Sequence, residues 1–221
     1  MLGRKNERLF SGHYNEWRKT RIAKLVSIFG KDFFDGKDIL ELGCGWGDIG
    51  EKFIEMGATV TFCDVRQEHL DEVKKRMPNS ITHMIDQDQP WNLDKKFDFV
   101  IHTGVLYHLS NWKQDLLCTL KHSNLIFLET VVSNNRSDSF EKTQKENGWD
   151  QSPHNISKRP SAAYIEKFLT EQGVSFERYD DADINAYFHR YDWVVGGRLP
   201  KIKMGSSSIQ GAPRRFWILR K

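Results

Sequence analysis

A short apolar segment of the chain runs directly into three alternating glycines. Residues 39–42 are Ile-Leu-Glu-Leu, and Gly43, Gly45 and Gly47 follow them before a stretch of helical periodicity begins. Glycine lets the backbone take left-handed conformations and approach a ligand closely, and the first turn of a helix presents free N–H groups. The sequence therefore predicts a strand, a tight turn and a helix, with a binding site at the turn.

Two nucleotide-binding patterns fit this turn in different frames. Residues 45–50 satisfy the dinucleotide pattern GxGxxG, whose first glycine normally follows the strand at once. That residue here is Gly43, and its frame requires a glycine at position 48 but finds Asp48. Counted from Gly43, the turn reads Glu-x-Gly-x-Gly-x-Gly, and Glu41 would attract a cationic sulfonium but repel a pyrophosphate. The frame favours S-adenosylmethionine over NAD, and it assigns Glu41, Gly43, Gly45 and Gly47 to the cofactor site.

Acidic residues also stand at the ends of the next two apolar segments. Asp64 lies about 20 residues beyond the turn, where a carboxylate can accept both ribose hydroxyls, and Val65 is its neighbour in this site. Asp86 is placed to contact an adenine edge, with Gln87 or Asp88 as near alternatives. Ligands of open α/β sheets bind outside the carboxyl ends of the strands, so acids at successive strand ends indicate a single site.

Short apolar segments alternate with longer segments of helical periodicity. Parallel strands require crossover connections, so this alternation predicts an α/β fold with a doubly wound, mostly parallel sheet. We expect a helical cover over residues 1–36 and one domain over residues 37–221, with irregular or mobile insertions near 133–160 and 184–213. The predicted strands cover residues 38–42, 59–63, 81–85, 97–102, 125–132 and 216–219, and the predicted helices cover 9–30, 47–56, 67–77, 112–121 and 161–172.

The bulk composition limits the class of protein. A length of 221 residues suits one α/β domain, and a formal net charge of +3 is too small to indicate nucleic-acid binding by itself. Cys44, Cys63 and Cys118 have neither CxxC nor Cys/His spacing, so we expect no disulfide framework and no metal. The chain opens without an apolar leader and has no apolar run of about 18 residues, so we expect a soluble, cytoplasmic protein without a membrane partner.

The glycine turn, Asp64 and Asp86 together resemble class I S-adenosylmethionine-dependent methyltransferases. A terminal strand over residues 215–221 is similar to that family's antiparallel hairpin of sixth and seventh strands, which dinucleotide dehydrogenases lack. The resemblance implies a seven-stranded, Rossmann-like sheet with an antiparallel terminal strand and S-adenosyl-L-methionine as cofactor. The function that we predict first is methyl transfer to a small metabolite, sugar or natural product.

Further segments resemble a narrower group, the tRNA enzymes that make 5-oxyacetyl or 5-methoxyuridine at the wobble position. The segments are Glu-Trp-Arg at 16–18, Gly-Val-Leu-Tyr-His at 104–108, Phe-Leu-Glu-Thr-Val-Val at 127–132, Pro-Ser-Ala at 160–162 and Ala-Pro-Arg-Arg at 212–215. A tRNA-modifying enzyme is therefore the alternative prediction. A non-catalytic cofactor-binding module is the second alternative.

This narrower resemblance also implies roles for single residues. It implies that Trp17, Tyr107 and Arg215 line the transferred group, and that a tyrosine and an arginine at the last two positions hold the extra carboxylate of carboxy-S-adenosyl-L-methionine. A guanidinium suits a carboxylate because it can donate to both oxygens. Lys5 and Arg8 are candidates for a further basic group. The cofactor contacts that the resemblance implies are Gly43, Asp64, Asp86 and Thr103.

Methyl transfer needs a general base only when the nucleophile is a neutral hydroxyl or amine. His108 is our candidate base, and Tyr107 is a candidate positioning hydroxyl; as purely structural groups they would be a helix cap and a packed aromatic ring. Further candidates come from segments expected to cover the site: His13, His154 and His189 as bases, and residues 189–193 as substrate contacts. Cys44 lies in the glycine turn without a neighbouring base, and we expect it to be inert.

Overall fold

A seven-stranded sheet forms the centre of the molecule in the computed structural model, which describes residues 13–148, 151–179, 184, 201–204, 207–210 and 214–221. The strand order is β3-β2-β1-β4-β5-β11-β8. Neighbours from β3 to β5 pair in parallel, whereas β11 runs antiparallel to both β5 and β8. The predicted fold class is confirmed. The strands are β1 (Asp38–Leu42), β2 (Thr59–Asp64), β3 (Ile81–Met84), β4 (Phe99–Thr103), β5 (Leu125–Val131), β8 (Ser175–Tyr179) and β11 (Arg214–Arg220).

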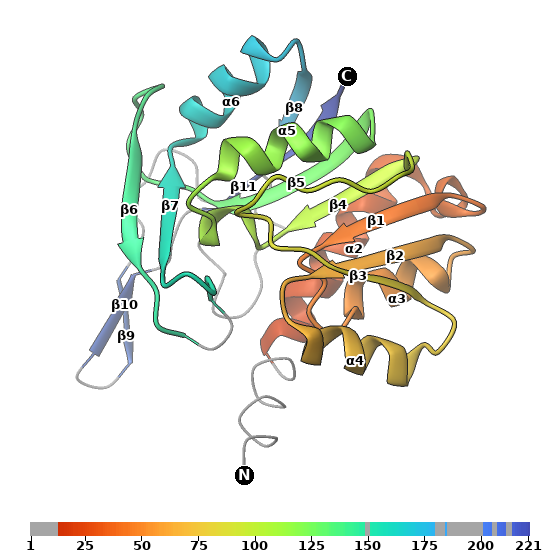
Figure 1. Cartoon of the computed structure of the whole chain (residues 1–221). Coiled ribbons are helices and arrows are strands. Elements are labelled where there is room, and N and C mark those ends of the chain that lie inside the picture. The colour runs from red at the N-terminus through yellow and green to blue at the C-terminus, as the bar shows by residue number, and fades with distance from the viewer. Residues whose placement is uncertain (1–12, 149–150, 180–183, 185–200, 205–206, 211–213) are drawn as a thin grey trace.

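Helices cover both faces of this sheet (Figure 1). On one face α5 (Trp112–His122) and α6 (Ala162–Glu171) pack against Leu40, Val100 and Leu128. The other face carries α2 (His13–Phe29), α3 (Asp48–Ile54), α4 (Gln67–Arg76) and the short helix η1 (Lys31–Phe34), and its core includes Phe99, Ile101 and Phe127. Alternate residues of β4 and β5 therefore belong to opposite cores, because successive strand side chains point to opposite faces. This explains why the strands read as continuous apolar runs.

The ends of the elements follow from single residues. Gly57 (φ 93°) and Gly173 (φ 70°) adopt left-handed conformations just after α3 and α6. The side chain of Ser161 caps α6 by accepting a hydrogen bond from the Tyr164 N–H at 3.0 Å. No helix in the described ranges is long and apolar enough to cross a membrane.

Three features of the fold differ from the predictions. The insertion near 133–160 contains an antiparallel hairpin of β6 (Glu141–Lys145) and β7 (Ile156–Pro160), although it was expected to be irregular. A second antiparallel pair, β9 (Lys201–Met204) and β10 (Ser207–Gln210), lies in the region expected to be a mobile loop. Strand β8 was not predicted. These strands have four or five residues each, and β6 is largely polar, so none shows the apolar pattern by which a buried strand is recognised.

Candidate functional site

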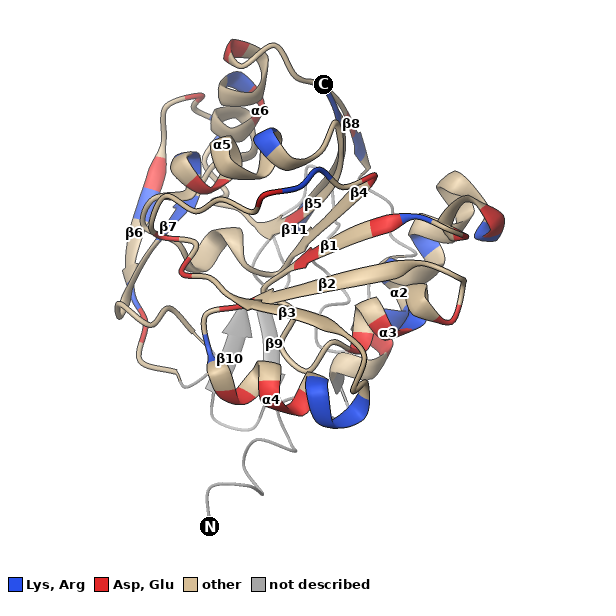
Figure 2. Ribbon diagram, turned by 45° about the vertical axis from the view of Figure 1, so that its right-hand side comes forward, with Lys and Arg blue, Asp and Glu red and all other residues tan. Residues whose placement is uncertain are grey.

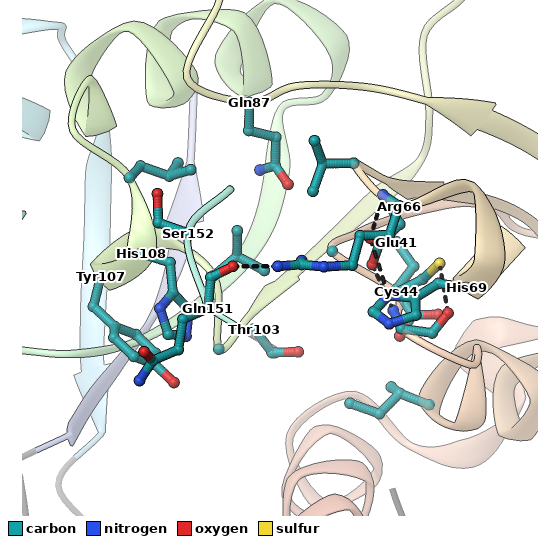
Figure 3. Close-up of a pocket in the computed structure, with 18 of the residues that line it drawn as sticks. Glu41, Cys44, Arg66, His69, Gln87, Thr103, Tyr107, His108, Gln151 and Ser152 are labelled. Atoms are coloured by element: carbon teal, nitrogen blue, oxygen red, sulfur yellow. Dashed lines mark hydrogen bonds and ion pairs between the residues drawn. The ribbon is translucent and has the colours of Figure 1, made fainter. Parts of the chain in front are cut away.

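A cleft opens at the carboxyl ends of β1, β2 and β4, where open α/β sheets commonly bind ligands. It encloses about 1140 Å³ between protein atoms, part of it open to solvent, and residues from the sheet, α2 and the insertion line it (Figure 3). Of the residues predicted from the sequence, the cleft brings together Trp17, Glu41, Gly43, Gly45, Asp64, Val65, Asp86, Gln87, Thr103, Tyr107 and His108. It includes neither Gly47 nor Arg215.

The glycine turn has a backbone that other residues would resist. Gly43, Gly45 and Gly47 have φ values of 64°, 53° and 75°, all in the left-handed region. A Cβ atom on Gly43 would lie 2.0 Å from Cγ2 of Val105, so this position is closed to any side chain. A Cβ atom on Gly47 would instead meet core side chains of β2 and α4, which places Gly47 under the turn and outside the cleft lining.

Glu41 lies beneath the turn with only 2% of its surface exposed. Its Oε2 accepts a hydrogen bond from the Gly50 N–H at 3.0 Å. Burial raises the pKa of the Glu41 carboxyl to about 8, although the Gly50 hydrogen bond and the charge of Arg18 act in the opposite direction. The protein without ligand therefore holds Glu41 largely protonated at neutral pH, and a cation in the cleft would favour its ionised form.

Asp64 fastens the turn to the end of β2. Its Oδ2 accepts from the Gly45 N–H at 2.9 Å, and its Oδ1 accepts from the Arg66 N–H at 2.9 Å and lies 3.1 Å from Nδ1 of His69. Each carboxylate oxygen has two acceptor sites. The geometry therefore leaves Asp64 able to accept further hydrogen bonds from a diol in the cleft.

The three polar residues after β3, Asp86, Gln87 and Asp88, make different contacts. Asp86 Oδ2 lies 2.9 Å from Nε2 of His154 at the cleft. The Gln87 amide donates to Asp115 at 3.1 Å, which leaves its carbonyl oxygen as an acceptor for a ligand. Asp88 is not a lining residue; its Oδ1 accepts from the Ser110 and Asn111 N–H groups just before α5.

At the other end of the cleft, Trp17 and Tyr107 lie beside a buried ion cluster. Glu129 accepts from Arg214 at 3.1 and 3.2 Å and from Arg21 at 3.1 Å, and Arg214 also hydrogen bonds to Tyr107. Burial raises the pKa of the Tyr107 phenol despite the nearby Arg214 guanidinium.

Arg214 takes the place in the cleft lining that was predicted for Arg215. Neighbouring residues on a strand point to opposite faces, so only one of these two arginines can face the cleft. The Arg215 guanidinium donates to the Arg214 carbonyl oxygen at 2.6 Å.

His108 closes the short helix η2 (Leu106–His108), which follows β4. Its Nδ1 lies 2.6 Å from Oε2 of Glu146, and its ring centroid lies 3.9 Å from that of Tyr107. Glu146 is 3% exposed and comes from the insertion, just after β6. Because Nδ1 is engaged by a carboxylate, Nε2 is the nitrogen that His108 can offer to a ligand.

Of the remaining sequence candidates, His154 and Cys44 lie in the described part of the chain and the others lie outside it. His154 contacts Asp86. Burial raises the pKa of the Cys44 thiol well above its usual value, which makes the thiol a poor nucleophile. Lys5, Arg8, the side chain of His13 and residues 189–193 lie outside the described residues. Sequence reasoning missed Arg18, Arg66, Glu146 and Arg214, of which only Arg18 and Arg214 stand in motifs that were noticed.

Replacing Glu41 with glutamine tests the raised pKa. Folding favours the protonated carboxyl, so the stability that Glu41 contributes is complete below pH 4.5 and is lost as the pH rises to about 8. We expect the free energy of unfolding of wild type, relative to Glu41→Gln, to fall with a slope approaching about 1.4 kcal/mol per pH unit in this window. Urea denaturation at pH 5, 6.5 and 8 measures the slope. Parallel curves would contradict the assignment, and Glu68→Gln on the exposed surface of α4 is the control.

Comparisons with known proteins place these features in a family. A family model described as "Methyltransferase domain" matches residues 14–178. An uncharacterized methyltransferase of Bacillus licheniformis is 24% identical over 159 residues, which cover 66% of this chain and 74% of that protein. The ubiquinone biosynthesis O-methyltransferase of Bartonella tribocorum is 28% identical over 133 residues, covering 53% of this chain and 54% of the enzyme. The chain thus spans about half the length of that O-methyltransferase.

Solved structures share the fold at lower identity. The structure titled "DhpI-SAM-HEP complex" has a TM-score of 0.64 at 14% identity, over 98% of this chain and 91% of that one. An S-adenosylmethionine-dependent methyltransferase from Clostridium acetobutylicum has a TM-score of 0.62 at 15% identity, over 99% and 97% of the two chains. The family match covers about three quarters of the chain and confirms the prediction of a methyl-transferring enzyme. The chain belongs to the methyltransferase domain family.

Proposed function

We propose that this protein transfers the methyl group of S-adenosyl-L-methionine to a hydroxyl oxygen of a small molecule, with His108 as the general base. The observation that carries the proposal is a cleft-lining imidazole whose Nδ1 is held by a buried carboxylate at 2.6 Å. Such an imidazole can act as a general base, and a general base is needed only when the nucleophile is neutral and must lose a proton. The relatives named as ubiquinone biosynthesis O-methyltransferases support an oxygen acceptor.

The residues of the cleft fit this cofactor. The left-handed backbone of Gly43 shapes the turn that lines the cleft, and Asp64 offers acceptors for ribose hydroxyls. The indole Nε1 of Trp17 is buried and has no hydrogen-bond partner in the described part of the chain, although Trp17 lines the cleft; a ligand acceptor would satisfy it. Neighbouring structures support the cofactor, since one holds S-adenosylhomocysteine and another, a magnesium protoporphyrin IX methyltransferase from Synechocystis, holds S-adenosylmethionine.

S-adenosyl-L-methionine supplies a methyl group made electrophilic by its sulfonium. Holding the acceptor in line with that methyl group provides much of the rate enhancement. His108 Nε2 takes the hydroxyl proton as the acceptor oxygen forms its bond to carbon and the carbon–sulfur bond breaks, with the electron pair left on sulfur. Tyr107, whose ring lies against the imidazole, limits where the acceptor can sit.

A donor bearing a carboxylate is the second candidate. It is favoured by the positive charge of Arg214, which lines the cleft beside Tyr107 and would attract a carboxylate. Mass analysis of the reaction product distinguishes the two donors, because carboxymethyl transfer adds a carboxyl group to the acceptor and methyl transfer does not.

A tRNA acceptor has less support. The cleft lining has three arginines and four acidic residues, and Figure 2 shows the two charge signs interleaved along the described ribbon. Salt-sensitive RNA binding would be the evidence for it. The predicted cytoplasmic location stays a prediction.

Asp64→Ala tests the cofactor site. The change removes the predicted ribose acceptor and the ties to the Gly45 and Arg66 N–H groups, so we expect the affinity for S-adenosylhomocysteine to fall by about 100-fold or more. Isothermal titration calorimetry measures this, with NAD as a ligand that should give no heat. Asp71→Ala, on exposed α4, is the control. Wild-type affinity in Asp64→Ala would refute the ribose assignment.

His108→Gln tests the base. We expect the rate of methyl transfer to fall by about 100-fold or more, because the variant cannot take the hydroxyl proton. The affinity for S-adenosylhomocysteine should stay within about threefold, since the change removes a proton acceptor and no predicted cofactor contact. The measurement is S-adenosylhomocysteine formation from a panel of phenols, catechols and aliphatic alcohols. His83→Gln on the exposed edge strand β3 is the matched control. A fully active His108→Gln would exclude the role of base.

A further inference from the structure

A segment of the insertion runs along the cleft and lines part of it. This strap, residues 146–148 and 151–155, contacts both ends of the site. At the acceptor end Glu146 meets His108, and at the cofactor end Arg66 donates to the Gln151 carbonyl oxygen while His154 pairs with Asp86 at 2.9 Å. Figure 3 shows Ser152 beside His108, and Gln151 between His108 and Arg66. The strap therefore joins the base to the residues predicted to hold the cofactor.

The hairpin that bears the strap is fixed to the chain immediately after His108. The Lys158 N–H of β7 donates to the Leu109 carbonyl oxygen at 2.9 Å, and the Ser110 hydroxyl donates to the Ile156 carbonyl oxygen at 3.0 Å. The Glu146 N–H closes the strap by donating to the Asn155 carbonyl oxygen at 3.0 Å. Hydrogen bonds to main-chain carbonyl groups on both sides thus set the position of Glu146 relative to His108.

The Glu146 carboxyl is ionised in this environment. Burial raises its pKa, but the hydrogen bonds from His108 and from the Ser152 N–H act in the opposite direction, and the pKa lies below its usual value. Oε2 accepts from both of these groups, at 2.6 and 3.0 Å, and Oε1 lies 3.6 Å from Nη2 of Arg159. An ionised carboxylate only accepts hydrogen bonds, so the hydrogen between Nδ1 and Glu146 belongs to the imidazole.

We infer that Glu146 is a positioning residue that selects the His108 tautomer protonated on Nδ1. Nε2 is then free to take the proton of the hydroxyl group that is methylated. When that proton moves from the hydroxyl oxygen to Nε2, the imidazole becomes a cation and the Glu146 carboxylate balances its charge. The hydroxyl oxygen keeps the electron pair of its O–H bond and uses it for the new bond to carbon. This inference rests on the proposed role of His108 as the base.

Two substitutions separate the tautomer from the charge. In Glu146→Gln the amide oxygen must occupy the Oε2 position, because the Ser152 N–H there needs an acceptor, so the variant still accepts from Nδ1 but carries no charge. Glu146→Leu has similar size and no acceptor. The matched control is Glu141→Gln in the same hairpin, because Glu141 accepts from the Trp112 indole and pairs with Lys158 rather than with His108.

Nitrogen-15 NMR of the imidazole, on the full chain at neutral pH with saturating S-adenosylhomocysteine, reports the tautomer directly. We expect hydrogen on Nδ1 in wild type, Glu146→Gln and Glu141→Gln, and a shift toward the Nε2–H form in Glu146→Leu. Wild type in the Nε2–H form, or an unchanged tautomer in Glu146→Leu, would overturn the inference. If Glu146→Leu does not fold, an Nε2–H tautomer in Glu146→Gln overturns it as well.

Kinetics distinguish this inference from the proposed function. With a hydroxyl acceptor from the panel, we expect kcat to fall by about 10-fold in Glu146→Gln and by about 100-fold in Glu146→Leu, while KM for S-adenosyl-L-methionine stays within about threefold. If Glu146→Leu is fully active and His108→Gln is inactive, the positioning role of Glu146 is wrong, but His108 can still be the base. If the tautomers are as expected and His108→Gln is fully active, His108 is not the base.

Discussion

The hydrogen bond from the Gly45 N–H to Asp64 ties the glycine turn to the end of the neighbouring strand, and the site is built around it. It is possible only because β1 and β2 pair in parallel register, with Leu42 opposite Cys63, so that both strands end at the same level. The Cys44 N–H extends this ladder by donating to the Cys63 carbonyl oxygen at 2.9 Å. A shift of one residue in either strand would move the carboxylate to the wrong face of the sheet.

A second constraint fixes the acceptor end of the cleft. Glu129 on β5 is fully buried, and Arg21 of α2 and Arg214 of β11 both bind it. Burial raises the pKa of Glu129, but the two guanidinium groups outweigh it and hold that pKa below its usual value. Loss of one partner from a buried ion pair commonly costs about 3–5 kcal/mol, so the cluster holds the helix and the terminal strand in place. Arg214 meets Tyr107 in the cleft as a consequence.

The sequence predicts the parts of this structure that depend on local pattern. The five parallel strands, the glycine turn and the acids at the strand ends were predicted because apolar runs and glycine spacing are readable within a few residues. The choice between Arg214 and Arg215 was not, since a single position decides which face a strand residue occupies and the flanking residues do not reveal it. Glu146 gave no signal: it stands in a polar stretch, 38 residues from His108, and no periodicity connects the two.

The division between sheet and insertion also bears on the chemistry. Neighbours at 14–15% identity share the sheet, and a shared fold does not determine the acceptor. In this chain the insertion places Glu146 against His108, with Oε2 2.6 Å from Nδ1. An acceptor that is already anionic would gain nothing from a proton acceptor and would be repelled by the charge of Glu146. If His108 acts as the proposed base, a neutral hydroxyl gives up its proton to the imidazole and the Glu146 carboxylate stabilises the resulting cation. The proposed pair therefore favours a neutral phenol or alcohol over an ionised acid as the group that is methylated.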